Sequence, residues 1–341
     1  MRRLLIPIFV VAFALGTVAA VIVVRQHAAP AAQESPVATT PDKDDDSDKD
    51  SSPRWPDDAG TPEQVLYAQE DLMRRAVEAL KPRSPGKANL YMIGFAGDGE
   101  EDVFRNEVEF AERLMAHRFD AEGHTLLLVN NPATLKTHPL ANLSNLQAAV
   151  DAIDNLMAPD EDILLLLLSS HGSREHELYV SMDPLPLDQI APDDLADVFA
   201  STHLRYKVIV ISACYSGGFI DALKDGRTMI VTAARADRAS FGCSADSDIT
   251  DFGRAFFVEG LNHNDSFQAA FAEASRTIEA RETRDDEEHS YPQFVTSPLI
   301  EAALKRWRDG IRLGAPVPFG LPTPPRKTDK EALTAAVLDL R

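Results

Sequence analysis

The sequence predicts a three-layer α/β/α sandwich around a mostly parallel central sheet. From residue 61 onward, short apolar runs alternate with segments in which apolar residues recur three or four positions apart. The run 163–168 is apolar on both of its faces, as expected for a central strand that helices cover on both sides. Because parallel strands need crossover connections, this alternation implies right-handed βαβ units.

The elements are expected in a regular order along the chain. A capping box from Thr61 to Gln64, with proline at the first helical position, predicts the start of the first helix. Short β-prone runs bounded by glycine or polar residues predict the strands, and periodic segments predict the helices. The strands are expected at residues 90–95, 124–129, 163–168, 208–211 and 229–231, and the helices around residues 66–80, 103–114, 146–157, 191–203 and 217–224.

The N-terminus is predicted to be a transmembrane signal anchor over residues 1–25. Two arginines precede an unbroken apolar run from Leu4 to Val24. A run of about 20 residues can cross a bilayer, whereas the apolar part of a cleaved signal peptide usually has about 7 to 15 residues. Arginines before the run favour a cytoplasmic N-terminus. We therefore expect a single-pass protein of a bacterial inner membrane with its catalytic domain in the periplasm. A cleaved signal peptide is the alternative.

The remaining chain divides by composition. Residues 26–60 are rich in Ala, Pro, Ser and Asp, and they are predicted to be a disordered tether because they cannot bury enough apolar surface to offset their ordering entropy. Residues 61–310 are expected to form the folded domain, and residues 311–341 a proline-rich arm with a short C-terminal helix. The formal net charge of −20 disfavours nucleic acid as a partner. The oligomeric state is left open.

A histidine and a cysteine follow two successive strands of the expected sheet. His171 comes just after the run 163–168, and Cys214 comes just after the run 208–211. In open α/β sheets, ligands bind beyond the carboxyl ends of the strands, so both side chains would reach one substrate carbonyl. A cysteine nucleophile needs a nearby base, and the dipole of a helix after Cys214 would lower the pKa of its thiol.

Backbone groups beside these residues are candidates for an oxyanion hole. The N–H groups of Gly172 and Cys214 are expected to serve, because glycine lets the backbone approach a developing oxyanion closely. A simpler reading of each residue remains, since a lone cysteine is often a small core residue and His-Gly is often a turn. The chain has two cysteines, and in an oxidising compartment a Cys214–Cys243 disulfide would remove the nucleophile.

We expect neither a cofactor nor a metal at this site. His176 lies close to His171, but zinc sites need three or four ligands at recognisable spacings, so it is predicted to be a loop residue. The turn 94–99 follows a strand but lacks the G-x-G-x-x-G spacing of a dinucleotide site. Asp98 or Glu101 is a candidate to orient His171, and the sequence does not decide between them.

The two strand-end motifs resemble those of the legumain-like C13 cysteine peptidases. In that family one apolar strand ends in His-Gly, and another ends in (Glu/Ser)-Ala-Cys-x-Ser-Gly. This chain has His171-Gly172 and, over residues 212–217, Ser-Ala-Cys-Tyr-Ser-Gly. A later family segment, Thr-Ala-Ala followed by Ser-x-x-Cys, is matched at residues 232–234 and 240–243.

The resemblance covers roughly residues 88–300 and points to a bacterial, membrane-anchored member. It implies a caspase-like fold, no cofactor, a dyad of His171 and Cys214, and cleavage or transfer at peptide bonds. By the same resemblance, Ser240 falls in a segment that borders the pocket for the residue before the scissile bond, so it is a candidate substrate-binding residue.

The specificity pocket of the family carries over only in part. Members that prefer asparagine have an acidic residue after a Leu-Gly, and this chain has Phe252-Gly253-Arg254 there. A guanidinium at the pocket floor would favour a carboxylate through paired hydrogen bonds. We therefore expect Arg254, in a region that also includes Arg235 and Arg238, to make acidic residues acceptable. The alternative is that these arginines lie on the surface and balance the acidic domain.

These observations predict a cysteine endopeptidase that acts on polypeptides through a Cys214 thioester, with His171 as acid and base. A transpeptidase with the same dyad would differ only in whether water or an amine resolves the thioester, and the sequence does not separate the two. A non-catalytic, membrane-tethered binding module is the remaining alternative.

Overall fold

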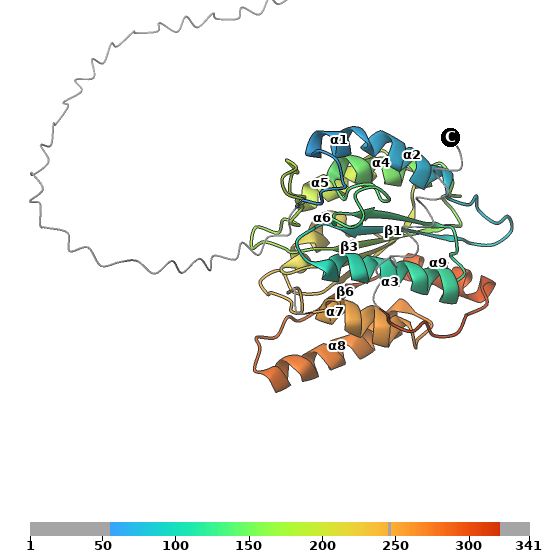
Figure 1. Ribbon diagram of the computed structural model, residues 1–341. Coiled ribbons are helices and arrows are strands. Elements are labelled where there is room, and N and C mark those ends of the chain that lie inside the picture. The colour runs from blue at the N-terminus through green and yellow to red at the C-terminus, as the bar shows by residue number, and fades with distance from the viewer. Residues whose placement is uncertain (1–54, 245–246, 321–341) are drawn as a thin grey trace, which may run out of the picture. The chain divides into compact units, whose positions relative to one another are not determined.

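A six-stranded sheet organises the computed structural model, which describes residues 55–244 and 247–320 (Figure 1). The strand order is β2-β1-β3-β4-β5-β6. Strands β1 to β5 are parallel, and β6 pairs with β5 in the antiparallel direction. The strands are β1 Leu90–Ala96, β2 Thr125–Val129, β3 Ile163–Ser169, β4 Tyr206–Ser212, β5 Thr228–Thr232 and β6 Gln293–Val295.

Helices cover both faces of this sheet, which confirms the predicted three-layer sandwich (Figure 1). One face is covered by α3 Asp102–Arg118, α7 Asp251–Gly253, the π-helix η2 Arg254–Leu261, α8 Phe267–Asp285 and α9 Pro298–Gly310. The other side carries α1 Pro62–Tyr67, α2 Gln69–Glu78, α4 Leu143–Asp154, α5 Pro192–Ala200, the 3₁₀ turn η1 Ser216–Phe219 and α6 Ile220–Leu223.

The central strand β3 supplies both hydrophobic cores. Leu165 and Leu167 join the core on the α3 side, and Leu166 and Leu168 join the core on the α4 side. Every residue of β3 is buried, as its two-faced apolar sequence predicts. Since a fully buried leucine contributes roughly 1.5 to 3 kcal/mol, this strand is a major source of the stability of the sheet.

The elements differ from the expected ones mainly at the ends of the chain. The capping box is present, with the Gln64 N–H donating to Thr61 Oγ1 at 3.2 Å and the Thr61 N–H to Gln64 Oε1 at 2.9 Å. The first helix divides at Ala68 into α1 and α2. The helix expected over residues 217–224 is only the two turns η1 and α6. Helices α8 and α9 and strand β6 were not predicted.

Folded structure begins before residue 61, which corrects the predicted extent of the tether. The Trp55 indole N–H donates to the Gly60 carbonyl at 2.8 Å, and Trp55 packs with Ala59 against a core cluster that contains Val65. Residues 55–60 therefore belong to the folded unit.

The proline-rich arm lies along the domain as far as Gly320. The Gly314 N–H donates to the Arg118 carbonyl at 2.8 Å, and the Val317 N–H donates to Asn262 Oδ1 at 2.8 Å. The predicted anchor, residues 26–54 of the tether and the predicted C-terminal helix lie outside the described residues. Within the described ranges, no helix is both long enough and apolar enough to cross a bilayer.

A carboxyl group lies within the core on the α3 side of the sheet. Glu107 on α3 has no exposed surface. Its Oε2 accepts hydrogen bonds from Thr250 Oγ1 at 2.7 Å, Ser169 Oγ at 3.1 Å and Ser212 Oγ at 3.3 Å. Burial raises the pKa of Glu107 to about 7, because the three hydroxyl groups replace only part of the lost hydration.

This raised pKa predicts a pH-dependent stability. The unionised carboxyl is favoured in the folded state. Its contribution to the free energy of unfolding is therefore complete below pH 4.5 and is lost as the pH rises through about 7. A shift of this size corresponds to about 3 kcal/mol. Glu107→Gln cannot titrate. The free energy of unfolding of wild type minus that of Glu107→Gln should therefore fall by about 3 kcal/mol between pH 4.5 and pH 8 in urea unfolding. A constant difference would contradict the assignment.

Candidate active site

The ends of β3 and β4 lie side by side. Ser169 and Ser212 are register partners in the parallel ladder, and His171 and Cys214 each follow two residues later. At Gly172 an added Cβ would collide with the Cys214 carbonyl oxygen, so the two loops meet at a point where only glycine fits. The structure therefore brings His171 and Cys214 to the same edge of the sheet.

The sulfur of Cys214 lies against Ser240. The Ser240 N–H donates to Cys214 Sγ at 3.2 Å, and Ser240 Oγ lies 3.7 Å from the same sulfur. When protonated, the thiol donates to the Ser240 carbonyl at 3.4 Å. Donors that point at a sulfur stabilise its thiolate form, so Ser240 holds and activates this side chain.

The pKa of Cys214 is lowered to about 6. The largest cause is a hydrogen bond with the Cys243 side chain, followed by the Ser240 groups and the charge of His171, while burial acts in the opposite direction. The pKa of Cys243 is raised, because its proton is held by the neighbouring sulfur and because the side chain is partly buried. Both cysteines are free thiols, so the alternative disulfide does not form in this structure.

The predicted helix dipole contributes little to this shift. The segment after Cys214 has one 3₁₀ turn and one α-helical turn, which is too short to carry a large dipole. Two side chains from the loop after β5 take that role instead.

Removing Cys243 should therefore raise the pKa of Cys214. In Cys243→Ala the thiolate loses a donor, and the pH at which Cys214 reacts at half its maximal rate with iodoacetamide should move from about 6 toward 9. The rate measured against pH, with the site of modification confirmed by mass spectrometry, tests this. A midpoint that does not move would show that Cys243 does not activate Cys214.

Glu101 is better placed than Asp98 to orient His171. Glu101 Oε2 lies 3.3 Å from His171 Nε2, and Asp98 Oδ2 lies 3.9 Å from it. The imidazole also contacts the edges of Phe104 and Tyr179, at centroid distances of 5.0 and 6.4 Å. Burial raises the pKa of Asp98 to about 6. The structure thus resolves the choice that the sequence leaves open, in favour of Glu101.

These acidic groups could also hold a divalent ion. The donor atoms of Asp98, Glu101 and His171 lie within 4.8 Å of one another. The expected absence of a metal therefore stays a prediction. His176 lies apart from this set, because its ring packs on Gly218 and its Nε2 is 3.0 Å from the Ala236 carbonyl. It fixes a loop, as the sequence predicts.

Two backbone donors are available beside the sulfur. In the described part of the chain, neither the Gly172 N–H nor the Cys214 N–H donates a backbone hydrogen bond. Free N–H groups at the nucleophile suit the role of an oxyanion hole, because they can meet a negative oxygen that develops on the substrate.

Ser240 borders a small cavity, and Arg254 does not. The cavity is lined by Ala233, Ser240, Phe241, Asp251, Phe252, Ile278, Arg281, Glu282 and Ser290. The Arg254 guanidinium instead lies over the ring of Phe319, at 5.0 Å from its centroid. The other two arginines of this region form ion pairs: Arg235 with Asp237 at 2.5 Å, and Arg238 with Glu288 at 3.3 Å. The structure thus places Ser240 beside Cys214 and Arg254 over the ring of Phe319, and the expected role of Arg254 in specificity stays a prediction.

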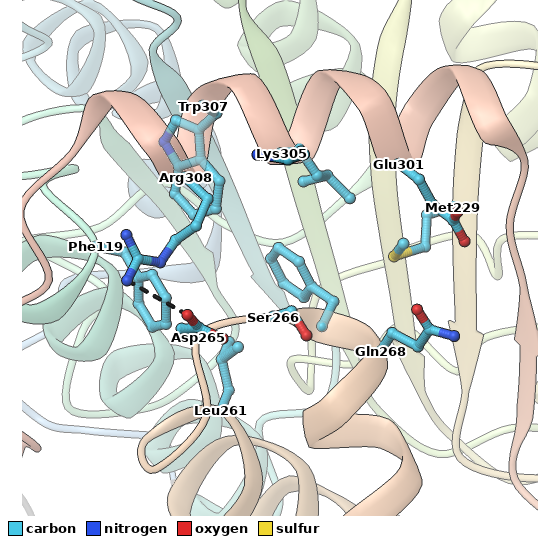
Figure 2. Close-up of a pocket in the computed structure, with 12 residues that line it drawn as sticks. Phe119, Met229, Leu261, Asp265, Ser266, Gln268, Glu301, Lys305, Trp307 and Arg308 are labelled. Carbon is cyan, nitrogen blue, oxygen red and sulfur yellow. Dashed lines mark hydrogen bonds and ion pairs between the residues drawn. The ribbon is translucent and has the colours of Figure 1, made fainter.

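A second cavity, of about 220 Å³, lies between α9 and the start of α8 (Figure 2). Figure 2 shows Trp307, Phe119 and Leu261 around it, with an ion pair between Arg308 and Asp265 at 3.5 Å. Its lining includes none of His171, Cys214 and Ser240.

Comparison with known proteins agrees with the strand-end motifs. The family model described as the Peptidase C13 family matches residues 141–302. Among solved structures, a crystal structure of caspase-1 from Spodoptera frugiperda is similar at 12% sequence identity and a TM-score of 0.42; the alignment covers 63% of this chain and 96% of that chain. No curated protein matches the chain.

The matched residues include β3, β4 and both members of the dyad. Over residues 141–302, which include His171 and Cys214, the chain is similar to the Peptidase C13 family.

Proposed function

We propose that the protein is a cysteine endopeptidase with Cys214 as nucleophile and His171 as acid and base. One observation carries the proposal: Cys214 Sγ accepts the Ser240 N–H at 3.2 Å, at the strand end that lies beside the His171 loop. The lowered pKa of Cys214 supports the same role, because a thiolate is the reactive form. The family match supports a polypeptide substrate.

The arrangement suits acyl transfer through a thioester. The Cys214 thiolate adds to the scissile carbonyl carbon, and the oxygen that becomes negative is met by the N–H groups of Gly172 and Cys214. Because His171 Nε2 faces Glu101, Nδ1 is the ring nitrogen left to protonate the leaving amine as the C–N bond breaks. Water then attacks the thioester, gives its proton to His171, and releases the acid and the thiolate.

Removal of either dyad member should abolish turnover. Cys214→Ala and His171→Ala should each lower kcat/KM for a peptide substrate by at least about 1000-fold, with unfolding curves like those of wild type. His263→Ala, at an exposed histidine whose Nδ1 contacts the Glu259 carbonyl, is the matched control and should be fully active. Near-normal cleavage by Cys214→Ala would overturn the proposal. Product masses with an added amine distinguish hydrolysis from transpeptidation.

We further propose that residues 1–25 anchor the protein in a bacterial inner membrane, with the domain in the periplasm. The apolar run from Leu4 to Val24 supports this. After a carbonate wash the full chain should remain with the membrane, whereas a chain that begins at Ser51 should be released. Full-length protein in the soluble fraction would contradict anchoring. A mature N-terminus near residue 20 would show a cleaved signal peptide instead.

A further inference from the structure

The Glu107 carboxyl group accepts hydrogen bonds from the last residues of both β3 and β4, just before the loops that carry His171 and Cys214. We propose that Glu107 is a positioning residue that holds the ends of β3 and β4 at a set separation and thereby fixes His171 relative to Cys214. The proposal rests on the function proposed for this dyad. Glu107 has no exposed surface, so it acts through other residues and does not touch the substrate.

The first step is the register of the two strands. Ser169 and Ser212 are paired neighbours in the ladder, and each lies two residues before a member of the dyad. Both hydroxyls donate to the same oxygen, Glu107 Oε2, at 3.1 and 3.3 Å. One carboxyl group on α3 therefore joins the last residues of both strands, just before their chains enter the catalytic loops.

The second step concerns the segment at Ser240, which contacts Cys214 Sγ. The Thr250 hydroxyl donates to Glu107 Oε2 at 2.7 Å and accepts the Gly253 N–H at 2.8 Å, which caps α7. The next residue, Asp251, donates its N–H to the Phe241 carbonyl at 3.2 Å. Phe241 follows Ser240, so the same carboxyl group also steadies the segment that holds the sulfur of Cys214.

The Glu107 carboxyl group is packed closely against α7. A Cβ at Gly253 would lie 2.5 Å from Glu107 Cδ, so the glycine is needed for α7 to approach. The other carboxyl oxygen, Oε1, is buried without a partner, so all of the hydrogen bonds converge on Oε2.

The charge of the group argues for a role beyond filling space. Above about pH 7 Glu107 is ionised, and hydrogen bonds to an ionised carboxylate are roughly twice as strong as those between neutral groups. Burying the same group costs stability, as the raised pKa of Glu107 shows. Burial raises this pKa, and the three hydroxyls of β3, β4 and the loop before α7 oppose the rise through their hydrogen bonds. A buried group that is costly and that binds both strand ends is well suited to hold a geometry.

The test compares Glu107→Gln with Glu112→Gln. Glu112 lies on the same helix and accepts the Thr125 hydroxyl at 2.9 Å, on β2 at the edge of the sheet, so it is the matched control. Competent sites are first counted with an irreversible peptidyl thiol probe, and turnover is then expressed per titrated site. Glu107→Gln should lower kcat per site about 10- to 100-fold with KM within about twofold of wild type. Glu112→Gln should match wild type.

A purely structural role would give another result. In that case Glu107→Gln would lower the number of titrated sites and leave kcat per site unchanged, which would overturn the proposal. Thr250→Ser and Thr250→Val give an independent check, because serine keeps the hydroxyl and valine does not. Turnover per site should survive in Thr250→Ser and fall in Thr250→Val, and equal effects of the two changes would count against the proposal.

Failure of the proposed function would be visible separately. If wild type cleaves no peptide, the rate of Cys214 alkylation against pH remains measurable in the same variants. Since the charge of His171 contributes to the lowered pKa of Cys214, a displaced His171 should move the midpoint to higher pH in Glu107→Gln. A midpoint equal to that of wild type and of Glu112→Gln would refute the positioning role whether or not the protein is a peptidase.

Discussion

Parallel pairing of β3 with β4 is the constraint on which the candidate site depends. Once Ser169 is paired with Ser212, the next residues of both chains leave the sheet on the same edge. The pairing of the two strands is therefore enough to place His171 and Cys214 at the same edge of the sheet. Burial of both faces of β3 and β4 keeps this register, because a slip by one residue would turn each apolar face toward the wrong core.

Activation of the thiol comes from the loop after β5 rather than from a helix. Ser240 and Cys243 both act on Cys214 Sγ, and their approach requires the chain to turn at Gly242, which has φ of +77°. A Cβ there would lie 2.6 Å from the Asp251 N atom. The pKa of Cys214 therefore depends on a segment distant from it in sequence. Loops held by a rigid sheet are well suited to such a task.

The strands, and the position of His171 and Cys214 at one edge of the sheet, could be predicted because their signal is local. An apolar run that ends in His-Gly or Ala-Cys is visible in a few residues. Glu107 was missed although it lies on the apolar stripe of α3, four positions after Val103, where a charged residue is a warning of a buried role. Its partners come from three distant segments, so sequence periodicity does not reveal them. The contact between Arg254 and Phe319 was not predicted for the same reason, since the two residues are far apart in the sequence.

The central claim is that Cys214 is the group that attacks the substrate carbonyl. The most direct measurement is to treat the full chain with a peptidyl electrophile and to locate the adduct by mass spectrometry. We expect a single adduct on Cys214, formed at least about tenfold faster than any on Cys243, because the pKa of Cys214 is lowered to about 6 and that of Cys243 is raised. Modification of Cys243 first, or of both cysteines at equal rates, would contradict it.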